Sequence, residues 1–275
     1  MAQTNHFRRF MAIWLLASVV ITPVSIILLA PILPPGHASV QASGHVVDNE
    51  VLLAGAIPVL LMVVIFLVYT VIYFREGVDG ATEGPAVRGD SRMQFTWIVI
   101  TSALVLSLAG YGSAELINDG AGSGQGPNAA FPAAGKPLQV QVIAEEWMFT
   151  YRYPTYGGVE TPHLVIPDNQ LVEFHVTSLD VIHSFWAYQL GVKADANPQQ
   201  DNVAYVTPTK LGSFSIRCAE LCGIWHGYMF DSGRVVTPAA FTSWIKSQQT
   251  QFAPIAGDLP PYSTTYQPQP SRRGA

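Results

Sequence analysis

Three long apolar runs occupy the first 117 residues and constrain the fold more than any other feature. They extend from Phe10 to Leu33, from Val51 to Phe74 and from about Phe95 to Leu116. Each is long enough to span a lipid bilayer as a helix, and membrane helices tolerate prolines such as Pro23 and Pro58. The chain is 49% hydrophobic and only 12% charged, too apolar for an ordinary soluble protein. We therefore expect membrane-spanning helices rather than the core helices of a soluble domain.

The first run has a second interpretation. Arg8 and Arg9 precede it, and Gly36-His37-Ala38 forms a weak cleavage site, as in a secretory signal peptide. The run is longer than a typical signal-peptide core, which favours a retained membrane helix. Residues 1–50 are therefore predicted to form a helix or leader followed by an outside loop.

The arginines around the runs predict the topology. Arg75, Arg88 and Arg92 lie between the second and third runs, whereas residues 34–50 contain no lysine or arginine. Because positively charged loops stay in the cytoplasm, we expect the N-terminus and loop 75–93 inside and loop 34–50 outside. Everything after the third run then lies outside a cell (inner) membrane that the chain crosses several times.

Strand-like alternation begins at Leu138. Apolar and polar residues alternate in several stretches separated by Pro and Gly, which favours an antiparallel β-sandwich or barrel. A short amphipathic helix is expected from Phe241 to Gln248. The predicted segments after residue 50 are a transmembrane hairpin at 51–117, a flexible linker at 118–137, a β-domain at 138–250 and a disordered Pro-rich tail at 251–275. The alternating apolar positions are Leu138, Val140, Val142, Val172, Phe174, Val176, Phe214 and Ile216.

The stretch from Cys218 to Met229 carries the chemistry. It holds both cysteines of the chain, with His226 four residues after Cys222 and Met229 three residues later. Thiolate, imidazole and thioether are soft or borderline ligands that together suit copper. Two thiolates in one short loop can bridge two coppers, which shares one electron over both metals and limits the geometry change on redox. A second imidazole is missing from the loop, and His183 is the best candidate for it.

Two simpler sites compete with this hypothesis. Cys218 and Cys222 could form a disulfide in an exported domain, or the loop could bind a single zinc ion. A disulfide requires neither His226 nor Met229, and structural zinc sites rarely use methionine. The remaining histidines are expected to be solvated or hydrogen-bonded, and they are His6, His37, His45, His163 and His175.

The loop and the segment Val176–Trp186 resemble subunit II of the haem–copper cytochrome c oxidases. The resemblance extends from about the second apolar run to about Val236. It implies a membrane-anchored all-β protein, with a cupredoxin-like Greek-key sandwich after a two-helix hairpin. It also implies two copper ions in a binuclear centre called CuA. The implied ligands are His183, Cys218, Cys222, His226, Met229 and the backbone carbonyl of Glu220.

The same resemblance assigns further roles. Trp147, in the aromatic strand Glu145–Tyr151, would receive the electron from cytochrome c, and the simpler alternative is a residue of the sandwich core. The Glu220 side chain would reach a Mg²⁺ or Mn²⁺ ion shared with subunit I. Asp195 would lie near the interface with subunit I, or would be an ordinary loop residue.

Two positions depart from the family pattern. Gln94 stands where the family commonly carries a glutamate at the mouth of a proton path into subunit I. A glutamine cannot exchange protons, so we expect the path to start elsewhere or to use an acidic residue of another subunit. Pro198-Gln199-Gln200 replaces a frequent Pro-Gly-Arg, which puts a contact to haem propionates or subunit I in doubt.

The resemblance implies subunit II of an aerobic respiratory cytochrome c oxidase, an oxidoreductase and translocase. Its partners would be subunits I and III, with cytochrome c or another small exported protein as donor. Acidic residues such as Glu160, Asp168 and Glu173 would steer the donor. A net charge of −5 makes nucleic acid an unexpected partner. The alternatives are a quinol oxidase subunit II, which lacks the copper ligands, and a membrane-anchored copper-delivery protein, which usually exposes Met- or His-rich tracts absent here.

Overall fold

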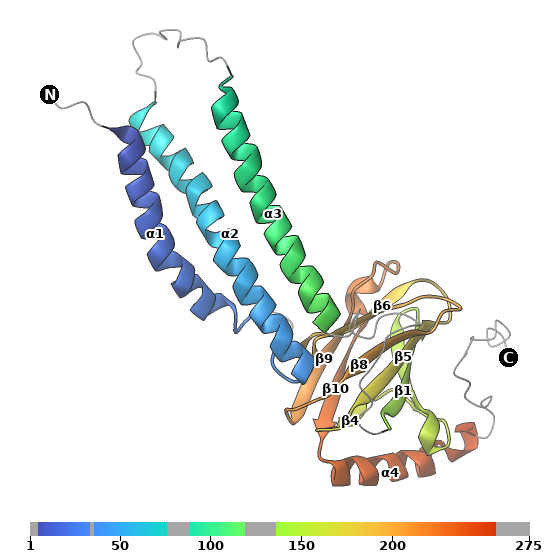
Figure 1. Cartoon of the computed structure of the whole chain (residues 1–275). Coiled ribbons are helices and arrows are strands. Elements are labelled where there is room, and N and C mark those ends of the chain that lie inside the picture. The colour runs from blue at the N-terminus through green and yellow to red at the C-terminus, as the bar shows by residue number, and fades with distance from the viewer. Residues whose placement is uncertain (1–4, 34–35, 76–88, 119–135, 257–275) are drawn as a thin grey trace. The chain divides into compact units, whose positions relative to one another are not determined.

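Three long helices form the N-terminal part of the chain (Figure 1). The computed structural model describes residues 5–33, 36–75, 89–118 and 136–256. Each of the three helices is long and apolar enough to cross a membrane, so the predicted runs are confirmed as helices. Their bounds are α1 (His6–Leu29), α2 (Val40–Tyr73) and α3 (Ser91–Asn118).

Helix α1 packs against α2 along one side. The Nδ1 atom of His6 lies 2.9 Å from the hydroxyl of Tyr69, and Trp14 Nε1 donates to the carbonyl of Pro58 at 2.9 Å. Phe10 meets the ring of Tyr69 edge-on. The contacting residues of α1 recur every four positions, which is the spacing that places them on one helix face.

Helix α2 begins earlier than its apolar run. The sequence predicted an outside loop up to residue 50, but residues 40–50 are already helical. The chain divides into two compact units, and the boundary falls inside α2. Residues 48–115 belong with the first helix, whereas residues 32–47 belong to the same unit as the β-domain.

The β-domain is a sandwich of two five-stranded sheets, with strand orders β3-β2-β1-β5-β8 and β4-β10-β9-β6-β7. The predicted β-sandwich is therefore confirmed. The bounds of the strands are β1 (Leu138–Glu145), β2 (Met148–Tyr153), β3 (Val159–Thr161), β4 (Val165–Pro167), β5 (Val172–Ser178), β6 (His183–Ala187), β7 (Val192–Ala196), β8 (Asn202–Val206), β9 (Gly212–Cys218) and β10 (Phe230–Val236). Three short 3₁₀ turns lie between strands, η1 (Pro154–Tyr156), η2 (Tyr188–Leu190) and η3 (His226–Tyr228).

Two strand pairs are parallel, so the prediction of an antiparallel sandwich was wrong for them. Leu138 of β1 lies opposite Val172 of β5, and Val165 of β4 lies opposite Arg234 of β10, with both strands of each pair running the same way. Side-chain alternation reports which face a residue occupies. It carries no information on the direction of the neighbouring strand.

The core lies between the sheets and contains all the predicted apolar positions. The polar face of the first sheet differs from expectation, because Gln141, His175 and Thr177 are also buried. His175 was expected to be solvated or hydrogen-bonded, and it is hydrogen-bonded, with Nδ1 2.8 Å from Asp201 Oδ2.

A C-terminal helix, α4 (Pro238–Ala256), covers β3 and β4. Its residues Phe241 and Ile245 are buried in the core cluster of the sandwich. The helix is longer than the predicted Phe241–Gln248, and residues 251–256, expected in a disordered tail, are helical. The rest of that tail, 257–275, and most of the predicted linker, 119–135, lie outside the described residues.

Candidate metal centre

The chemistry-bearing loop joins two neighbouring antiparallel strands. Cys218 is the last residue of β9 and Met229 directly precedes β10. The amide of Cys218 donates to the carbonyl of Met229 at 3.0 Å, which closes the base of the loop. The loop turns at Gly223, whose φ of 111° is accessible mainly to glycine. The continuing ladder therefore holds both ends of the loop in place.

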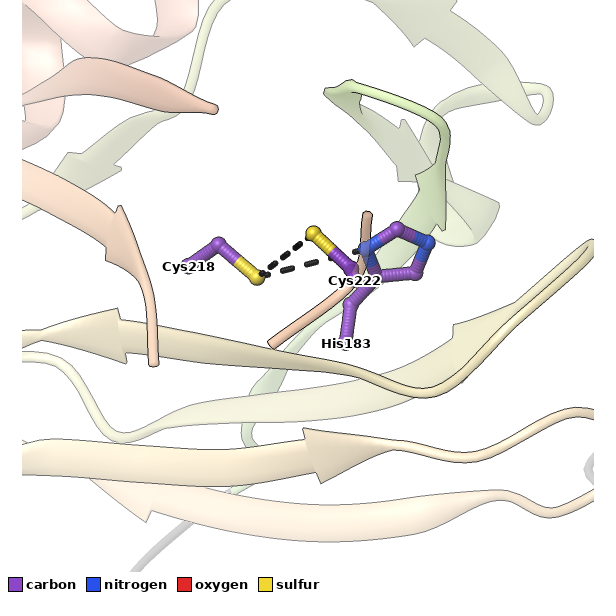
Figure 2. A group of neighbouring side chains, drawn as sticks. All are labelled: His183, Cys218 and Cys222. Atoms are coloured by element: carbon purple, nitrogen blue, oxygen red, sulfur yellow. Dashed lines mark hydrogen bonds between the residues drawn. The ribbon is translucent and has the colours of Figure 1, made fainter. Parts of the chain in front are cut away.

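The two thiols face each other at the base of the loop (Figure 2). Cys218 Sγ and Cys222 Sγ are 3.6 Å apart, and both residues are buried free cysteines. The structure therefore contains no disulfide between them, although the sequence left that alternative open.

Two imidazoles and a thioether complete the cluster. His183, at the start of β6, places Nδ1 3.9 Å from Cys218 Sγ. His226 Nδ1 lies 3.4 Å from Cys222 Sγ, and Met229 Sδ lies 3.8 Å from the same sulfur. The ligand atoms of His183, Cys218 and Cys222 all lie within 4.8 Å of one another. His183, which precedes Cys218 by 35 positions, thus lies beside the thiol and thioether groups of the loop.

The donor set suits copper. It consists of sulfur and imidazole nitrogen, with the carbonyl oxygen of Glu220 3.3 Å from Cys218 Sγ. Soft sulfur donors favour copper over hard cations such as Mg²⁺, and a buried methionine sulfur is foreign to structural zinc sites. Both sulfurs of the cysteines lie close enough together to share the same ions.

The thiols differ in acidity. Burial raises the pKa of Cys218, but hydrogen bonds from His183 and from the backbone outweigh it and bring the pKa down to about 6. Burial and the adjacent Cys218 raise the pKa of Cys222 to about 12. One thiol therefore ionises easily, and the second ionises only when a cation compensates the first negative charge.

Asp180 supports the cluster, and sequence reasoning missed it. Its Oδ1 atom lies 2.8 Å from His183 Nε2, which leaves Nδ1 directed toward the thiols. Its Oδ2 atom accepts a hydrogen bond from the amide of Glu146 at 2.7 Å. A carboxylate on the outer nitrogen of a ligand histidine fixes the ring orientation. Its position three residues before His183 was the only signal available in the sequence.

Trp147 lies on a hairpin turn rather than within a strand. The predicted strand Glu145–Tyr151 is interrupted, because β1 ends at Glu145 and β2 begins at Met148. Trp147 is half-buried, and its Nε1 donates to the carbonyl of Cys222 at 2.9 Å. A Cβ on Gly223 would lie 3.3 Å from the indole ring. The turn thus places the indole directly against the thiol loop.

The predicted steering acids do not gather near the thiols. Glu173 is engaged with His175 and Tyr205, and Glu160 accepts from Thr150. Asp168 donates its amide to Val236, at the end of β10 remote from Met229. These acids were chosen by charge alone, and charge does not report position.

The remaining predicted residues are exposed. Glu220 directs its carbonyl toward Cys218 and exposes its side chain. Asp195 is exposed on β7 opposite Ser184, one position from His183. Gln94 is exposed on α3.

Comparisons with protein families and with curated proteins both find similarity to one family. Residues 159–235 match the family described as "Cytochrome C oxidase subunit II, periplasmic domain". Cytochrome c oxidase subunit 2 of Synechocystis sp. is 28% identical over 216 residues, covering 65% of this chain and 64% of that protein. The Bacillus subtilis protein of the same name is 28% identical over 241 residues, covering 82% of this chain and 66% of that protein. The chain thus spans slightly less than two thirds of the length of these relatives.

A solved structure is similar as well. The periplasmic domain of subunit II of cytochrome oxidase from Bradyrhizobium japonicum is 31% identical, with a TM-score of 0.42, covering 44% of this chain and 99% of that one. The segment matched by the family contains His183, Cys218, Cys222, His226 and Met229, and Trp147 precedes it.

Proposed function

We propose that this chain, which is similar to members of the cytochrome c oxidase subunit II family, is the electron-accepting subunit of an aerobic respiratory oxidase. It takes one electron at a time from cytochrome c or another small exported donor. It passes each electron to haem in subunit I, where O₂ is reduced to water and protons are translocated. Subunit III is the other expected partner.

The convergence of two buried thiols with His183, His226 and Met229 carries this proposal. These five side chains and the Glu220 carbonyl would hold two copper ions. When bound, the pair supplies a redox centre that gains and loses one electron. The protein contributes a rigid cage, because paired strands hold His183 and both ends of the loop that carries the other donors.

Trp147 is the proposed point at which the electron enters. Its indole is partly exposed and is joined to the thiol loop through the Cys222 carbonyl. A donor that contacts this ring would be connected to Cys222 by one hydrogen bond and a short stretch of backbone. Asp180 holds the turn that carries the ring.

The interface with subunit I is proposed to include a second cation. The exposed carboxylate of Glu220 belongs to the residue whose carbonyl faces the thiols. Carboxylate oxygen suits Mg²⁺ or Mn²⁺. One residue would then contact both the electron path and the subunit interface.

The sandwich is proposed to lie on the outer side of a cell (inner) membrane. The arginine distribution supports this orientation, and the match to a periplasmic domain agrees with it. A reporter fused after Ala133 should lie outside and one in loop 75–93 inside, and the reverse result would contradict the orientation. N-terminal sequencing of the mature subunit decides whether α1 is removed.

Copper stoichiometry tests the function itself. The purified native complex should contain two coppers per copy of this chain, and its oxidised form should show one unpaired electron shared by both. A quinol oxidase subunit would bind no copper here. A copper-delivery protein would bind one copper or none, so its spectrum would show no electron shared between two coppers. Haem in the same preparation separates an oxidase from an isolated copper-delivery protein, and copper separates it from a quinol oxidase.

A further inference from the structure

A short segment between α1 and α2 is part of the β-domain. Residues 36–47, here called the clasp, precede the membrane-spanning part of α2 and include its first turns. They fall in the same compact unit as the sandwich. The sequence predicted only a loop at these positions, whereas the structure holds them against the β-domain.

Backbone hydrogen bonds join the clasp to two turns of the sandwich. The amide of Ala38 donates to the carbonyl of Gln189 at 3.0 Å, and the carbonyl of Ala38 accepts from Thr209 at 2.9 Å. The amide of Val40 donates to the carbonyl of Thr207 at 3.1 Å. Gln189 belongs to η2, and residues 207–209 connect β8 to β9. The clasp therefore lies across the turns at one end of both sheets.

One buried hydroxyl strengthens this junction. Ser39 is fully buried, and its Oγ donates to the carbonyl of Leu190 at 2.6 Å. The same Oγ accepts from the amide of Ala42 at 2.9 Å, which caps the start of α2. Gln41 Oε1 accepts from the amide of Thr207 at 3.0 Å. A single serine thus links the sandwich to the first turn of the helix.

A glycine permits the close approach. Gly191 follows η2 with a φ of 68°, and a Cβ there would lie 2.9 Å from both Cα and N of Ala42. Ala42 is fully buried. A side chain at position 191 would therefore collide with the backbone of the clasp, which cannot move without breaking the bonds described above.

The turns that the clasp binds lie at the far ends of the ligand-bearing strands. Strand β6 begins at His183 and leads into η2, and β9 begins after the 207–209 turn and ends at Cys218. The clasp thus secures β6 and β9 at the ends away from the thiols.

We propose that the surface formed by η2, Gly191 and the 207–209 turn is a docking site whose occupant is residues 36–47 of the same chain. The copper domain is then attached to the helical unit twice, through the clasp and through residues 119–135. The second attachment keeps the domain with the membrane part independently of the connection after α3. It does not depend on bound metal, so it stands or falls separately from the proposed function.

The test uses the full-length chain in detergent, with an affinity tag inserted between residues 76 and 88 and a site-specific protease sequence inserted between residues 119 and 135. After cleavage, the domain can remain with the tagged helices only through non-covalent contact. We expect the wild-type domain to stay bound through washing, and an excess of a synthetic 36–47 peptide to displace it.

Paired variants assign the contact to the clasp. Gly191→Ala should release the domain, whereas Gly157→Ala should not, because Gly157 has a similar φ of 77° but its added Cβ would meet only Gln249, at 4.0 Å. Ser39→Ala should weaken retention about tenfold, through loss of its hydrogen bond to the carbonyl of Leu190. Ser43→Ala, which removes only a bond to the carbonyl of Ser39 within the clasp, should have little effect.

Circular dichroism of the released domain checks that it is folded, and Ser39→Ala serves if Gly191→Ala does not fold. Release of the wild-type domain on cleavage would overturn the proposal. Equal retention of wild type and Ser39→Ala, together with no displacement by the peptide, would also overturn it.

Discussion

The indole nitrogen of Trp147 donates a hydrogen bond to the carbonyl oxygen of Cys222, 2.9 Å away. The two residues are 75 positions apart in sequence, one on the turn between β1 and β2 and the other in the loop between β9 and β10. The bond brings a partly exposed aromatic ring to the backbone of a residue whose sulfur lies in the candidate metal centre. It gives the proposed electron path a definite first step.

Replacing Trp147 tests that step. Trp147→Ala should lower kcat/KM for cytochrome c oxidation by about thirtyfold, the effect of losing a contact worth about 2 kcal/mol. Copper content and the haem spectra should stay unchanged. Trp147→Phe keeps an aromatic ring without the N–H group, so its kcat/KM should lie between the values of wild type and Trp147→Ala. Normal turnover of Trp147→Ala in steady-state assays would show that the residue serves only packing.

Asp180 should control how His183 is held. Asp180→Ala removes the acceptor for both His183 Nε2 and the Glu146 amide, and each lost bond to a charged group costs about 1.5–3 kcal/mol. We expect two coppers to be retained with altered histidine couplings in magnetic resonance spectra, and slower cytochrome c oxidation. Asp195→Asn is the control, because it changes a nearby exposed charge without a described contact to His183. Identical spectra for wild type and Asp180→Ala would contradict this role.

The thiols and the thioether should differ in importance. Cys218→Ser or Cys222→Ser should abolish the spectrum of a shared unpaired electron, because one thiolate cannot bridge the pair in the same way. Met229→Leu should keep both coppers but make them unequal, since a thioether is a weak ligand. Metal analysis with electron paramagnetic resonance separates these results. Full copper loading of either serine variant with an unchanged spectrum would refute the ligand assignment.

Glu220→Gln should separate the two proposed roles of that residue. Every residue supplies a carbonyl, so both coppers and their colour should remain. The neutral amide should bind Mg²⁺ or Mn²⁺ less tightly than the carboxylate does. Mn²⁺ in the assembled complex, followed by its magnetic resonance signal, should be ordered in wild type and lost or altered in the variant. Unchanged Mn²⁺ binding would leave Glu220 as a backbone contributor alone.

The stabilisation that charged His175 gives the domain should be lost at alkaline pH. Burial lowers its pKa, but hydrogen bonds to Asp201 and Glu173 outweigh this and raise the pKa to about 9. Tyr205 and Gln139 also contact Glu173. Because the folded pKa exceeds the unfolded value of about 6.5, the stabilisation is complete below about pH 6.5 and is lost as the pH rises through about 9, for a total of about 3 kcal/mol.

Denaturation as a function of pH checks this expectation. The stability advantage of wild type over His175→Gln should be greatest near pH 6 and should shrink by about 3 kcal/mol by about pH 10, above the raised pKa. His163→Gln, which changes an exposed histidine, should behave as wild type throughout. A constant difference between wild type and His175→Gln across this range would rule out a charged histidine.

Much of the architecture could be predicted because it depends on local pattern. Long apolar stretches specify helices in a membrane, and alternation at Leu138, Val140 and Val142 specifies an inward face. The parallel pairing of β1 with β5 could not be predicted, since both directions bury the same side chains. The turn at Trp147 was also missed, because aromatic residues on both sides of it suit strands equally well.

The sequence by itself predicted the candidate donors of the thiol loop. Cys218, Cys222, His226 and Met229 lie within twelve positions, so any fold of that loop keeps them near one another, and soft donors in that spacing indicate copper. Only the tertiary structure decided what surrounds the set. The Trp147 indole contacts Cys222, and the clasp contacts Gly191, although each pair is far apart in sequence. Asp180 is close to His183 in sequence, but no motif marks it as a hydrogen-bond partner. Such contacts form only when the chain packs, and the type of a residue does not specify which distant residue will lie beside it.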